Sequence, residues 1–434
     1  MKKVLIITYY WPPAGGIGVL RCLKFAKYLR KFGWEPVIYA PENASYPYLD
    51  KTNEKDIPQG ITILKTPISE PFGLFKKLSG RKKNDAANPV YARDKKVGLI
   101  DDLAIWIRGN FFIPDARSRW IKPSVKYLVK YLKENPVDAI LTDGPPHTNT
   151  VIGCRVSQKT GIPWLADFQD PWTQVDYYKM FKISKWADKK HRKLEQEAFA
   201  TAKKITIASP TWAKDLESIG AKNVDTVYYG YDEDDFINLD FTPDNDFSIV
   251  HAGLLGYDRK PDVLFEVLSE LKKEIPGFSE KLKLKFAGNI DFSVKEVLKE
   301  KGLEENLVEL GNITKPEALQ LTVKAHILLL PLNKADNVMG RIPGKIYENL
   351  RAYRPILALG PKNSDVDKII TKVGAGKTIE YEDFKETRDF IVNKYNLFLE
   401  GKNFIEKGEV SYLSNENQTK KIAEYLNKIS NHEV

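Results

Sequence analysis

Two adjacent cations, Arg259 and Lys260, follow the apolar run "FSIVHAG" and its glycine turn. Pro261 can begin a helix directly after them, so both side chains would lie beside a helix N-terminus. Positive charge, the helix dipole and backbone donors would then converge on one anion, while Gly253 leaves room for it. The spacing predicts a diphosphate site, and the alternative is a pair of exposed basic residues on a turn.

A second polar loop, "NVMGRIPGKIYENL", leads into another helical pattern before the apolar run "PILALG". Arg341 and Lys345 in this loop favour an anionic ligand, and Gly344 leaves space before the helix. Glu348 falls in the first turns of that helix, where its carboxylate can accept hydrogen bonds from both hydroxyls of a ribose. The alternative for Glu348 is that it only complements the helix dipole.

The N-terminal stretch "ITYYWPPAGGIG" connects an apolar run to a helical pattern through two prolines and several glycines. Gly15, Gly16 and Gly18 remove side chains where the backbone amides of the next helix can approach an anion. The spacing does not match the G-x-G-x-x-G dinucleotide fingerprint, and no acidic residue ends the second predicted strand. We therefore expect contact with an anionic ligand at this turn rather than a dinucleotide site.

His147 follows the apolar run "DAILT" within the turn "GPPHTN" and opens a helical pattern. This position at the end of a predicted strand favours a catalytic role over a structural one. Asp167 and Asp170 follow the next strand in "ADFQDPW", where one of them could orient an acceptor and Asp170 could instead cap a turn. Other histidines are alternatives to His147 for the catalytic role. We expect His191 on a charged helix, and His251 and His326 in the core or near a cleft.

The elements that must position these residues are short apolar runs that alternate with helical patterns along nearly the whole chain. Such alternation predicts repeated βαβ units, and hence parallel sheets covered by helices on both faces. The pattern restarts after the turn-rich stretch "NLDFTPDNDF". We predict an α/β protein with two Rossmann-like, doubly wound domains that face a central cleft, at 1–238 and 239–408. A C-terminal helix at 409–434 would return to the first domain.

The 434 residues carry a formal net charge of +9, with a pI near 9.0, which favours an anionic partner. Trp106, Phe111 and Phe112 lie in an amphipathic segment, so docking on an anionic membrane is a hypothesis, with a solvated basic surface as its alternative. Binding to nucleic acid is less favoured, because the aromatics are not interleaved with basic residues along one surface. The basic residues form two groups: Lys76, Lys77, Arg81, Lys82 and Lys83, and, at helical spacing, Arg21, Lys24, Lys27 and Lys31.

No apolar run approaches the roughly 18 residues of a membrane span, and the N-terminal run is too short for a signal peptide. Only Cys22 and Cys154 are present, in separate helical patterns, so neither a disulfide framework nor a cysteine-rich metal site is predicted. We expect a cytoplasmic protein, peripheral on the inner face of the cell membrane.

Together these motifs resemble those of the retaining GT-B glycosyltransferases of family 4, which bind nucleotide-activated sugars between two Rossmann-like domains. The resemblance covers nearly the whole chain, through "PPAGGIG", "DGPPHTNTVIG", "ADFQDPW", "HAG…DRK", "LGNITKPEAL" and "PGKIYENLRAYRPILALG". It implies transfer of a sugar from a nucleoside-diphosphate sugar, such as a UDP-sugar, to a hydroxyl of a glycan or lipid-linked acceptor. Synthesis of a cell-surface polysaccharide or glycolipid is the implied setting.

The resemblance also implies roles for individual residues. Gly15 and Gly16 would lie against the donor diphosphate and the acceptor, and His147 would contact the transferred sugar. Arg259 and Lys260 would neutralise the departing diphosphate, so neither a metal nor another cofactor is expected. Backbone atoms of Gly311, Asn312 and Ile313 would hold the base, and the carboxylate of Glu348 would take the ribose.

In one respect the sequence departs from this family. Gly340 stands eight positions before Glu348, where the family often carries a first glutamate, so a carboxylate near the donor sugar is missing there. Branches with a similar P-x-K-x-Y-E loop rely on backbone amides instead. A sugar-nucleotide epimerase or hydrolase on the same scaffold is the alternative enzyme, which would turn over the nucleotide sugar without an acceptor.

Overall fold

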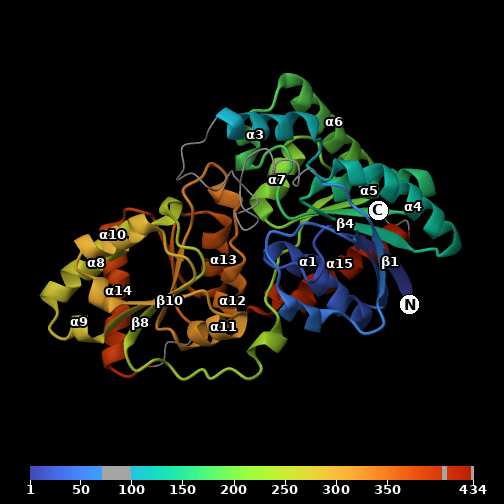
Figure 1. The fold of residues 1–434 in the computed structure, drawn as a ribbon. Coiled ribbons are helices and arrows are strands. Elements are labelled where there is room, and N and C mark those ends of the chain that lie inside the picture. The colour runs from blue at the N-terminus through green and yellow to red at the C-terminus, as the bar shows by residue number, and fades with distance from the viewer. Residues whose placement is uncertain (71–98, 403–407, 432–434) are drawn as a thin grey trace. The chain divides into compact units, whose positions relative to one another are not determined.

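The computed structural model describes residues 1–70, 99–402 and 408–431 (Figure 1). The chain divides into two compact units, one of Met1–Tyr228 with Asn415–Val434 and the other of Tyr229–Ser414. We call them the N-terminal unit and the C-terminal unit.

A seven-stranded parallel sheet forms the centre of the N-terminal unit, in the order β3-β2-β1-β4-β5-β6-β7. Because β2 and β4 flank β1 on opposite sides, the strand order reverses there, which creates a switch point of the kind where such sheets bind ligands. The strands are β1 (Lys2–Ile7), β2 (Trp34–Pro41), β3 (Thr62–Thr66), β4 (Ala139–Gly144), β5 (Trp164–Phe168), β6 (Lys204–Ile207) and β7 (Val224–Thr226). The helices are α1 (Ile17–Leu29), α3 (Leu99–Phe111), α4 (Ile121–Glu134), α5 (His147–Thr160), α6 (Lys185–Thr201), α7 (Pro210–Ser218) and α15 (Asn415–Ser430).

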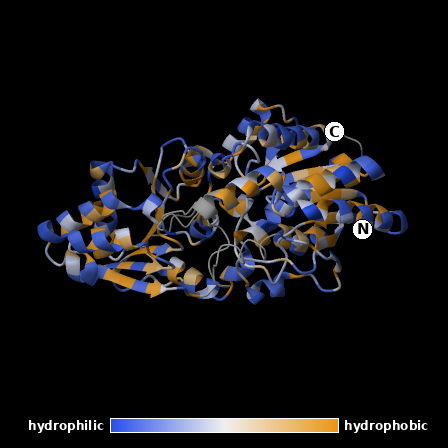
Figure 2. Cartoon of the chain, turned by 45° about the horizontal axis from the view of Figure 1, so that its top comes forward, coloured by the Kyte–Doolittle hydropathy of each residue, from blue (hydrophilic) through white to orange (hydrophobic). Residues whose placement is uncertain are grey.

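Helices cover both faces of this sheet. Strand β1 illustrates why its side chains must be apolar on both sides. Successive side chains of a strand point to opposite faces, so Leu5 belongs to a core shared with α4 and α5. Ile6 belongs to a second core shared with α1 and α15. A strand such as β1, buried on both faces, therefore needs an uninterrupted apolar run. Figure 2 shows apolar residues along the strands and polar residues on the outward sides of the helices.

The C-terminal unit repeats this plan with a six-stranded parallel sheet in the order β10-β9-β8-β11-β12-β13. Its switch point lies beside β8, which β9 and β11 flank. The strands are β8 (Phe247–Ala252), β9 (Leu282–Ala287), β10 (Leu307–Gly311), β11 (Ile327–Pro331), β12 (Ile356–Leu359) and β13 (Gly376–Ile379). The helices are α8 (Asp262–Glu274), α9 (Phe278–Lys281), α10 (Phe292–Glu300), α11 (Lys315–Lys324), α12 (Lys345–Arg351), α13 (Asp365–Val373) and α14 (Phe384–Leu399).

These two doubly wound parallel sheets confirm the predicted fold class of paired Rossmann-like domains. The chain passes from the N-terminal to the C-terminal unit after residue 228, whereas the sequence predicts residue 238. The backbone amide of Tyr231 already donates a hydrogen bond to the carbonyl of Leu413 in the C-terminal unit. The chain returns after residue 414 rather than 408. The terminal helix α15 then packs on α1, and Ile422 and Leu426 enter the core beneath it.

The helical row of basic residues on α1 is not the exposed surface that its spacing suggested. Arg21 and Lys24 are buried, and Lys24 Nζ lies 2.6 Å from an oxygen of Asp56. Lys27 pairs with the same carboxylate at 2.9 Å, and Lys31 pairs with Glu416 of α15. Arg21 and Lys24 therefore belong to a packing face, whereas Lys31, in the 3-10 turn at Arg30–Phe32 after α1, is 56% exposed and pairs at the surface. The second basic group, at 76–83, lies outside the described residues.

Arg21 and Asp167 form a buried ion pair that ties four elements together. The guanidinium donates to both carboxylate oxygens, with Nη2 2.7 Å from Oδ1, and also to the carbonyls of Val227 and Tyr228 after β7. Thr206 on β6 donates a further hydrogen bond to the carboxylate. The predicted acceptor role of Asp167 therefore lacks an accessible oxygen, because this side chain is buried and its bonds hold α1, β5 and β6 together.

None of the helices in the described ranges is long and apolar enough to cross a bilayer. Cys22 and Cys154 are free thiols, buried in the two cores of the N-terminal unit.

Removal of the Asp167 carboxylate should destabilise the N-terminal unit strongly. In Asp167→Ala the guanidinium of Arg21 is left buried without its counter-charge, a defect that costs about 3–5 kcal/mol. All eight tryptophans lie between residues 11 and 212, so urea unfolding followed by tryptophan fluorescence reports on this unit.

The matched control is Glu416→Ala, which breaks the exposed pair with Lys31 and should cost less than about 1 kcal/mol. Equal losses in the two variants would contradict the structural role given to the buried pair.

Candidate functional site

The C-terminal unit contains a cavity of about 270 Å³ at the carboxyl ends of three neighbouring strands. Its floor is made by the residues that follow β8, β9 and β10, and its sides by α11 and α12. Parallel sheets bind ligands at this edge because loops and helix N-termini meet there. The lining residues are Ala252, Gly253, Ala287, Gly288, Asn312, Ile313, Lys315, Ala318, Leu319, Thr322, Lys345, Glu348 and Asn349.

Lys345, the first residue of α12, brings a partly buried ammonium group to this cavity. Its Nζ lies 3.2 Å from Nε2 of His251, and it forms no salt bridge within the described part of the chain. Burial, with the charge of Arg259 nearby, lowers the pKa of Lys345 to about 7. The side chain is therefore only partly charged near neutral pH, and an anion placed beside it would restore the charge.

His251, at the end of β8, is neutral and oriented by its partners. Burial first, and then the charge of Lys345, lower the pKa of His251 to about 3. Its Nδ1 lies 3.0 Å from the carbonyl oxygen of Leu329, which can only accept, so the proton is on Nδ1. Nε2 then carries a lone pair and accepts a hydrogen bond from the lysine. The imidazole thus holds the lysine without adding charge to the cavity.

Two glycines make room for this arrangement. A Cβ on Gly253 would lie 2.7 Å from Nζ of Lys345, and Gly253 has a positive φ of 131°. A Cβ on Gly288 would lie 2.6 Å from the carbonyl oxygen of Gly253. Both positions therefore require glycine, and the bare backbone of the turn after β8 forms part of the cavity floor.

Three residues further along α12, Glu348 lines the same cavity and is held by a charged bridge. Nζ of Lys315 lies 3.2 Å from Oε1 of Glu348 and 2.7 Å from Oδ2 of Asp235. The two carboxylates raise the pKa of Lys315 despite the opposing effect of its burial. About 30% of the Glu348 side chain is exposed. One carboxylate oxygen is thus fixed by the lysine, and the group remains accessible from the cavity.

The structure brings together five of the residues that the sequence assigned to donor binding: Gly253, Asn312, Ile313, Lys345 and Glu348. Gly311 stands behind them with a φ of 61°, where its left-handed conformation turns the chain at the end of β10. Gly344 caps the N-terminus of α12. Arg341 follows a short 3-10 turn at Val338–Gly340 and is not among the lining residues.

The predicted cation pair is divided by the structure. Arg259 pairs with Asp258 at 2.9 Å and is close enough to Lys345 to lower the pKa of that lysine. Lys260 lies 3.6 Å from Asp262 at the start of α8, and neither Arg259 nor Lys260 is among the residues that line the cavity. Lys345 rather than Lys260 is therefore the lysine that Arg259 accompanies. The sequence missed Lys315 as well, because nothing in "GNITKPEAL" distinguishes it from a surface lysine.

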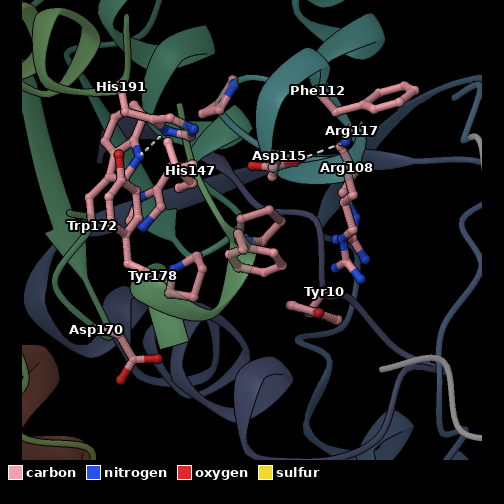
Figure 3. A pocket seen from close by; sticks show the side chains of 16 residues that line it. Tyr10, Arg108, Phe112, Asp115, Arg117, His147, Asp170, Trp172, Tyr178 and His191 are labelled. Atoms are coloured by element: carbon pink, nitrogen blue, oxygen red, sulfur yellow. Dashed lines mark hydrogen bonds between the residues drawn. The ribbon is translucent and has the colours of Figure 1, made fainter. Parts of the chain in front are cut away.

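The N-terminal unit contains a second cavity, of about 290 Å³, beside the start of α5 (Figure 3). It is lined mainly by aromatic and charged side chains from the loops after β1 and β5, from α3 and the segment after it, from the start of α5, from the turn before α6 and from α6 itself. The lining residues are Tyr10, Arg108, Gly109, Phe112, Pro114, Asp115, Arg117, Pro145, Pro146, His147, Asp170, Trp172, Tyr178, Phe181, Ile183 and His191.

His147 forms one wall of this cavity. Its ring stacks on Trp172 with centroids 4.5 Å apart and an interplanar angle of 2°. Burial lowers the pKa of His147 to about 3, so the imidazole is neutral. Its Nδ1 is buried and has no hydrogen-bond partner among the described residues. A neutral imidazole with an unpaired nitrogen can exchange a hydrogen bond with a ligand hydroxyl, but it supplies no positive charge.

Two further groups hold this wall in place. The indole Nε1 of Trp172 donates to Nδ1 of His191 at 3.1 Å, so His191 fixes the ring on which His147 stacks (Figure 3). Asp115 accepts hydrogen bonds from the backbone and the hydroxyl of Thr148, which anchors the start of α5. The sequence placed His191 on a charged helix without a role, because only the fold turns it inward.

The glycine turn before α1 has a structural reason as well as the predicted functional one. A Cβ on Gly15 would overlap the ring of Tyr48 at 2.1 Å, and one on Gly18 would lie 3.3 Å from Tyr10. Gly16 begins α1 with a φ of 83°. None of the three lines the cavity, whereas Tyr10 and Asp170 do.

No protein-family model and no curated protein matches this sequence. Sucrose-phosphate synthase from Thermosynechococcus elongatus has a similar structure, with a TM-score of 0.52 and 12% identity over 100% of this chain and 97% of that one. The lipopolysaccharide outer core galactosyltransferase WaaB, in its apo form, gives a TM-score of 0.55 and 13% identity over all of both chains. A protein assigned as a UDP-N-acetylglucosamine 2-epimerase in Listeria monocytogenes gives 0.54 and 10%, over 100% and 97%.

The chain has the GT-B fold. At 10–13% identity these similarities establish the fold alone. The chemistry has to be argued from the residues that line the two cavities.

An anionic ligand that binds beside Lys345 should bind together with a proton. The anion raises the pKa of Lys345 above its value of about 7 in the free protein, so deprotonated molecules must take up a proton. The affinity for a nucleoside diphosphate should therefore fall between about pH 7 and 9, by at most about tenfold per pH unit. Isothermal titration calorimetry in buffers of different ionisation enthalpy measures both quantities.

The control is Lys345→Arg, whose side chain stays charged throughout this range and should bind with little pH dependence. Wild-type binding that is flat in pH and releases no buffer heat would contradict the assigned role of Lys345.

Proposed function

We propose that the protein is a glycosyltransferase that moves a sugar from a nucleoside-diphosphate sugar to a hydroxyl of a glycan or lipid-linked acceptor. The observation that carries this proposal is the cavity of the C-terminal unit, where the ammonium of Lys345 and the carboxylate of Glu348 stand at the carboxyl ends of parallel strands. These two charges suit the two ends of one ligand, since a diphosphate needs a cation and a ribose needs an acceptor.

In this proposal the donor diphosphate lies against Gly253 and Lys345, with Arg259 adding positive charge. The bond between the anomeric carbon and the diphosphate oxygen breaks through an oxocarbenium-like state, and the cations stabilise the charge that develops on the leaving group. They take the place that a divalent metal would have, so the proposed mechanism uses none. The acceptor hydroxyl oxygen forms the new bond to the anomeric carbon, and its proton passes to an oxygen of the departing diphosphate.

The N-terminal unit supplies the acceptor side in this proposal. The ring of His147 would contact the sugar being transferred, as the resemblance of the motifs implies, and the aromatic walls beside Trp172 would hold the acceptor. Asp170 remains a candidate for orienting it, whereas Asp167 is occupied by Arg21. Retention of anomeric configuration, membership of family 4 and a UDP-linked donor belong to the proposal through the resemblance of the motifs.

The second candidate is a sugar-nucleotide epimerase or hydrolase. The similarity to the Listeria monocytogenes protein favours it as the alternative, since the fold does not separate the two chemistries. The alternative makes a different prediction about the acceptor, because an epimerase or hydrolase consumes the nucleotide sugar alone. A cytoplasmic location suits either reaction, as both use nucleotide sugars.

The test begins with the thermal stability of the protein in a panel of nucleotide sugars. A ligand present at a hundredfold its Kd stabilises the folded protein by about 2.7 kcal/mol, which a melting curve detects. The donor found in this way is then incubated with candidate acceptors and the products are separated. Lys345→Met should lower kcat about 100-fold, the loss found when one preorganised donor is removed from a developing anion.

Lys283→Met is the control, a partly exposed lysine on β9 outside the cavity, and it should leave kcat unchanged. Turnover of the donor at full rate without any acceptor would overturn the transferase proposal in favour of the epimerase or hydrolase. Failure of the whole panel to shift the melting curve would overturn both.

Glu348 should give the cavity its preference for ribose. Loss of its hydrogen bonds to the ribose hydroxyls in Glu348→Ala costs about 1.5–3 kcal/mol, because a charged acceptor is removed. The wild type should bind a ribonucleoside diphosphate at least tenfold more tightly than its 2′-deoxy analogue, and the variant should not distinguish them. Lys315→Met, which frees the carboxylate, should give an intermediate ratio.

Competition of both nucleotides against a labelled donor measures these ratios. Glu309→Ala is the control, since Glu309 is exposed on β10 and pairs with Lys295 away from the cavity. If Glu348→Ala still binds the ribonucleoside diphosphate more tightly than its 2′-deoxy analogue, another group contacts the ribose.

A further inference from the structure

The N-terminal unit carries an exposed surface in which large apolar side chains and lysines stand together on α3, on the 3-10 turn at Asp176–Phe181 and on α6. We call it the α3–α6 surface. Its apolar members are exposed by 37–64%, although residues of these types are usually buried: Leu103, Trp106, Phe111, Met180 and Trp186. Its cationic members on α6 are all exposed: Lys185, Lys189, Lys190 and Lys193.

The elements of this surface are joined by direct contacts. Asn110 of α3 donates to the carbonyl of Lys182 and accepts from the backbone of Ser184, the residue that caps α6. The rings of Trp106 and Phe111 meet with centroids 5.7 Å apart. Figure 1 shows α3 and α6 as neighbours within this unit. The exposed rings of α3 and the start of α6 therefore belong to one surface.

The geometry of α6 separates its charges from its core. At about 100° per residue, the four lysines and Trp186 fall within about 140° of the helix circumference. The buried residues occupy the opposite side: Ala187, His191, Glu195 and Ala198. The ammonium of Lys190 also lies over the ring of Trp186 at 4.1 Å. One side of the helix is thus basic with an aromatic ring, and the other is packed.

The charge of this segment is strongly one-sided. Residues 179–193 contain six lysines and one arginine but a single acidic residue, Asp188, which gives 7 − 1 = +6. Asp188 itself pairs with Arg192 at 2.9 Å. Exposed aromatic and aliphatic side chains beside clustered lysines match the chemistry of an anionic bilayer, whose headgroups attract the charges while the interface accepts the rings.

We propose that the α3–α6 surface docks the protein on an anionic lipid bilayer. The same elements line the cavity of the N-terminal unit from within, through Arg108 and Gly109 of α3 and Phe181 of the turn. Docking therefore brings that cavity next to the lipid headgroups. If the proposed transfer is correct, the acceptor is then a saccharide carried on a membrane lipid, and this second part of the inference rests on the proposed function.

The test is sedimentation of the full chain with large unilamellar vesicles. The protein should sediment with vesicles of phosphatidylcholine and phosphatidylglycerol in equal parts, and far less with phosphatidylcholine alone. Replacing Lys185, Lys189, Lys190 and Lys193 by glutamine should lower the partition coefficient at least about 100-fold at low ionic strength. The combined variant Trp106→Ser, Phe111→Ser, Trp186→Ser should lower it in both low and high salt, since burial of rings is not screened.

Matched controls come from exposed residues of the C-terminal unit. Lysine-to-glutamine changes at Lys273, Lys281, Lys299 and Lys385 remove the same charge, and Ile237→Ser, Phe292→Ser, Leu399→Ser remove comparable apolar area. Neither control set should alter the partition coefficient. Equal losses in the control and test variants would show attraction through net charge alone, and would overturn the proposed surface.

Thermal stability in the presence of the donor nucleotide separates this proposal from the proposed function. Docking variants should keep the ligand-induced shift of the melting temperature, which depends on the C-terminal unit. If wild type ignores the vesicles but responds to the nucleotide, the docking proposal fails and the proposed function stands. If the wild type sediments with vesicles but binds no nucleotide sugar, the docking proposal stands. The proposed glycosyltransferase function is then overturned, and the inference of a lipid-linked acceptor is overturned with it.

Discussion

The partial burial of one ammonium group, that of Lys345, sets the electrostatics of the cavity in the C-terminal unit. A charge partly removed from water is unfavourable, and burial together with the charge of Arg259 lowers the pKa of the lysine by more than the carboxylate of Glu348 raises it. His251 offers only a neutral lone pair. A bound anion would supply the missing partner, so the cost of burying the ammonium is relieved when a ligand arrives.

Buried and partly buried charges have two roles in this molecule: some join elements of the fold, and others remain available to a ligand. Arg21 and Asp167 complete each other and join elements of the N-terminal sheet, and so they have nothing left to offer a ligand. Lys315 is likewise satisfied by Asp235 and by Glu348, but it leaves part of that glutamate exposed to the cavity. The distinction between structural and functional charge therefore lies in the partners, which neither residue type nor position along a strand reveals.

The sequence was sufficient to predict the architecture, because a parallel strand buried on both faces must be apolar along its length and must be followed by a covering helix. It also located the strand ends at which Gly253 and His147 stand, and the start of the helix that carries Glu348. It could not pair charges that lie far apart in the chain, so it predicts a surface position for Arg21 and an acceptor contact for Asp167, and both predictions are wrong. Trp172 and His191 are nineteen positions apart (191 − 172 = 19), and only the packing of α6 brings their rings together.

Hydrogen–deuterium exchange with and without a nucleoside diphosphate tests the central claim most directly. If the cavity of the C-terminal unit holds the nucleotide, amides should be protected in the turns after β8 and β10 and at the start of α12. The amides of β5 and β6 around the Arg21–Asp167 pair should exchange unchanged. Saturable binding that leaves those three segments unprotected, or that protects only the N-terminal unit, would contradict the account.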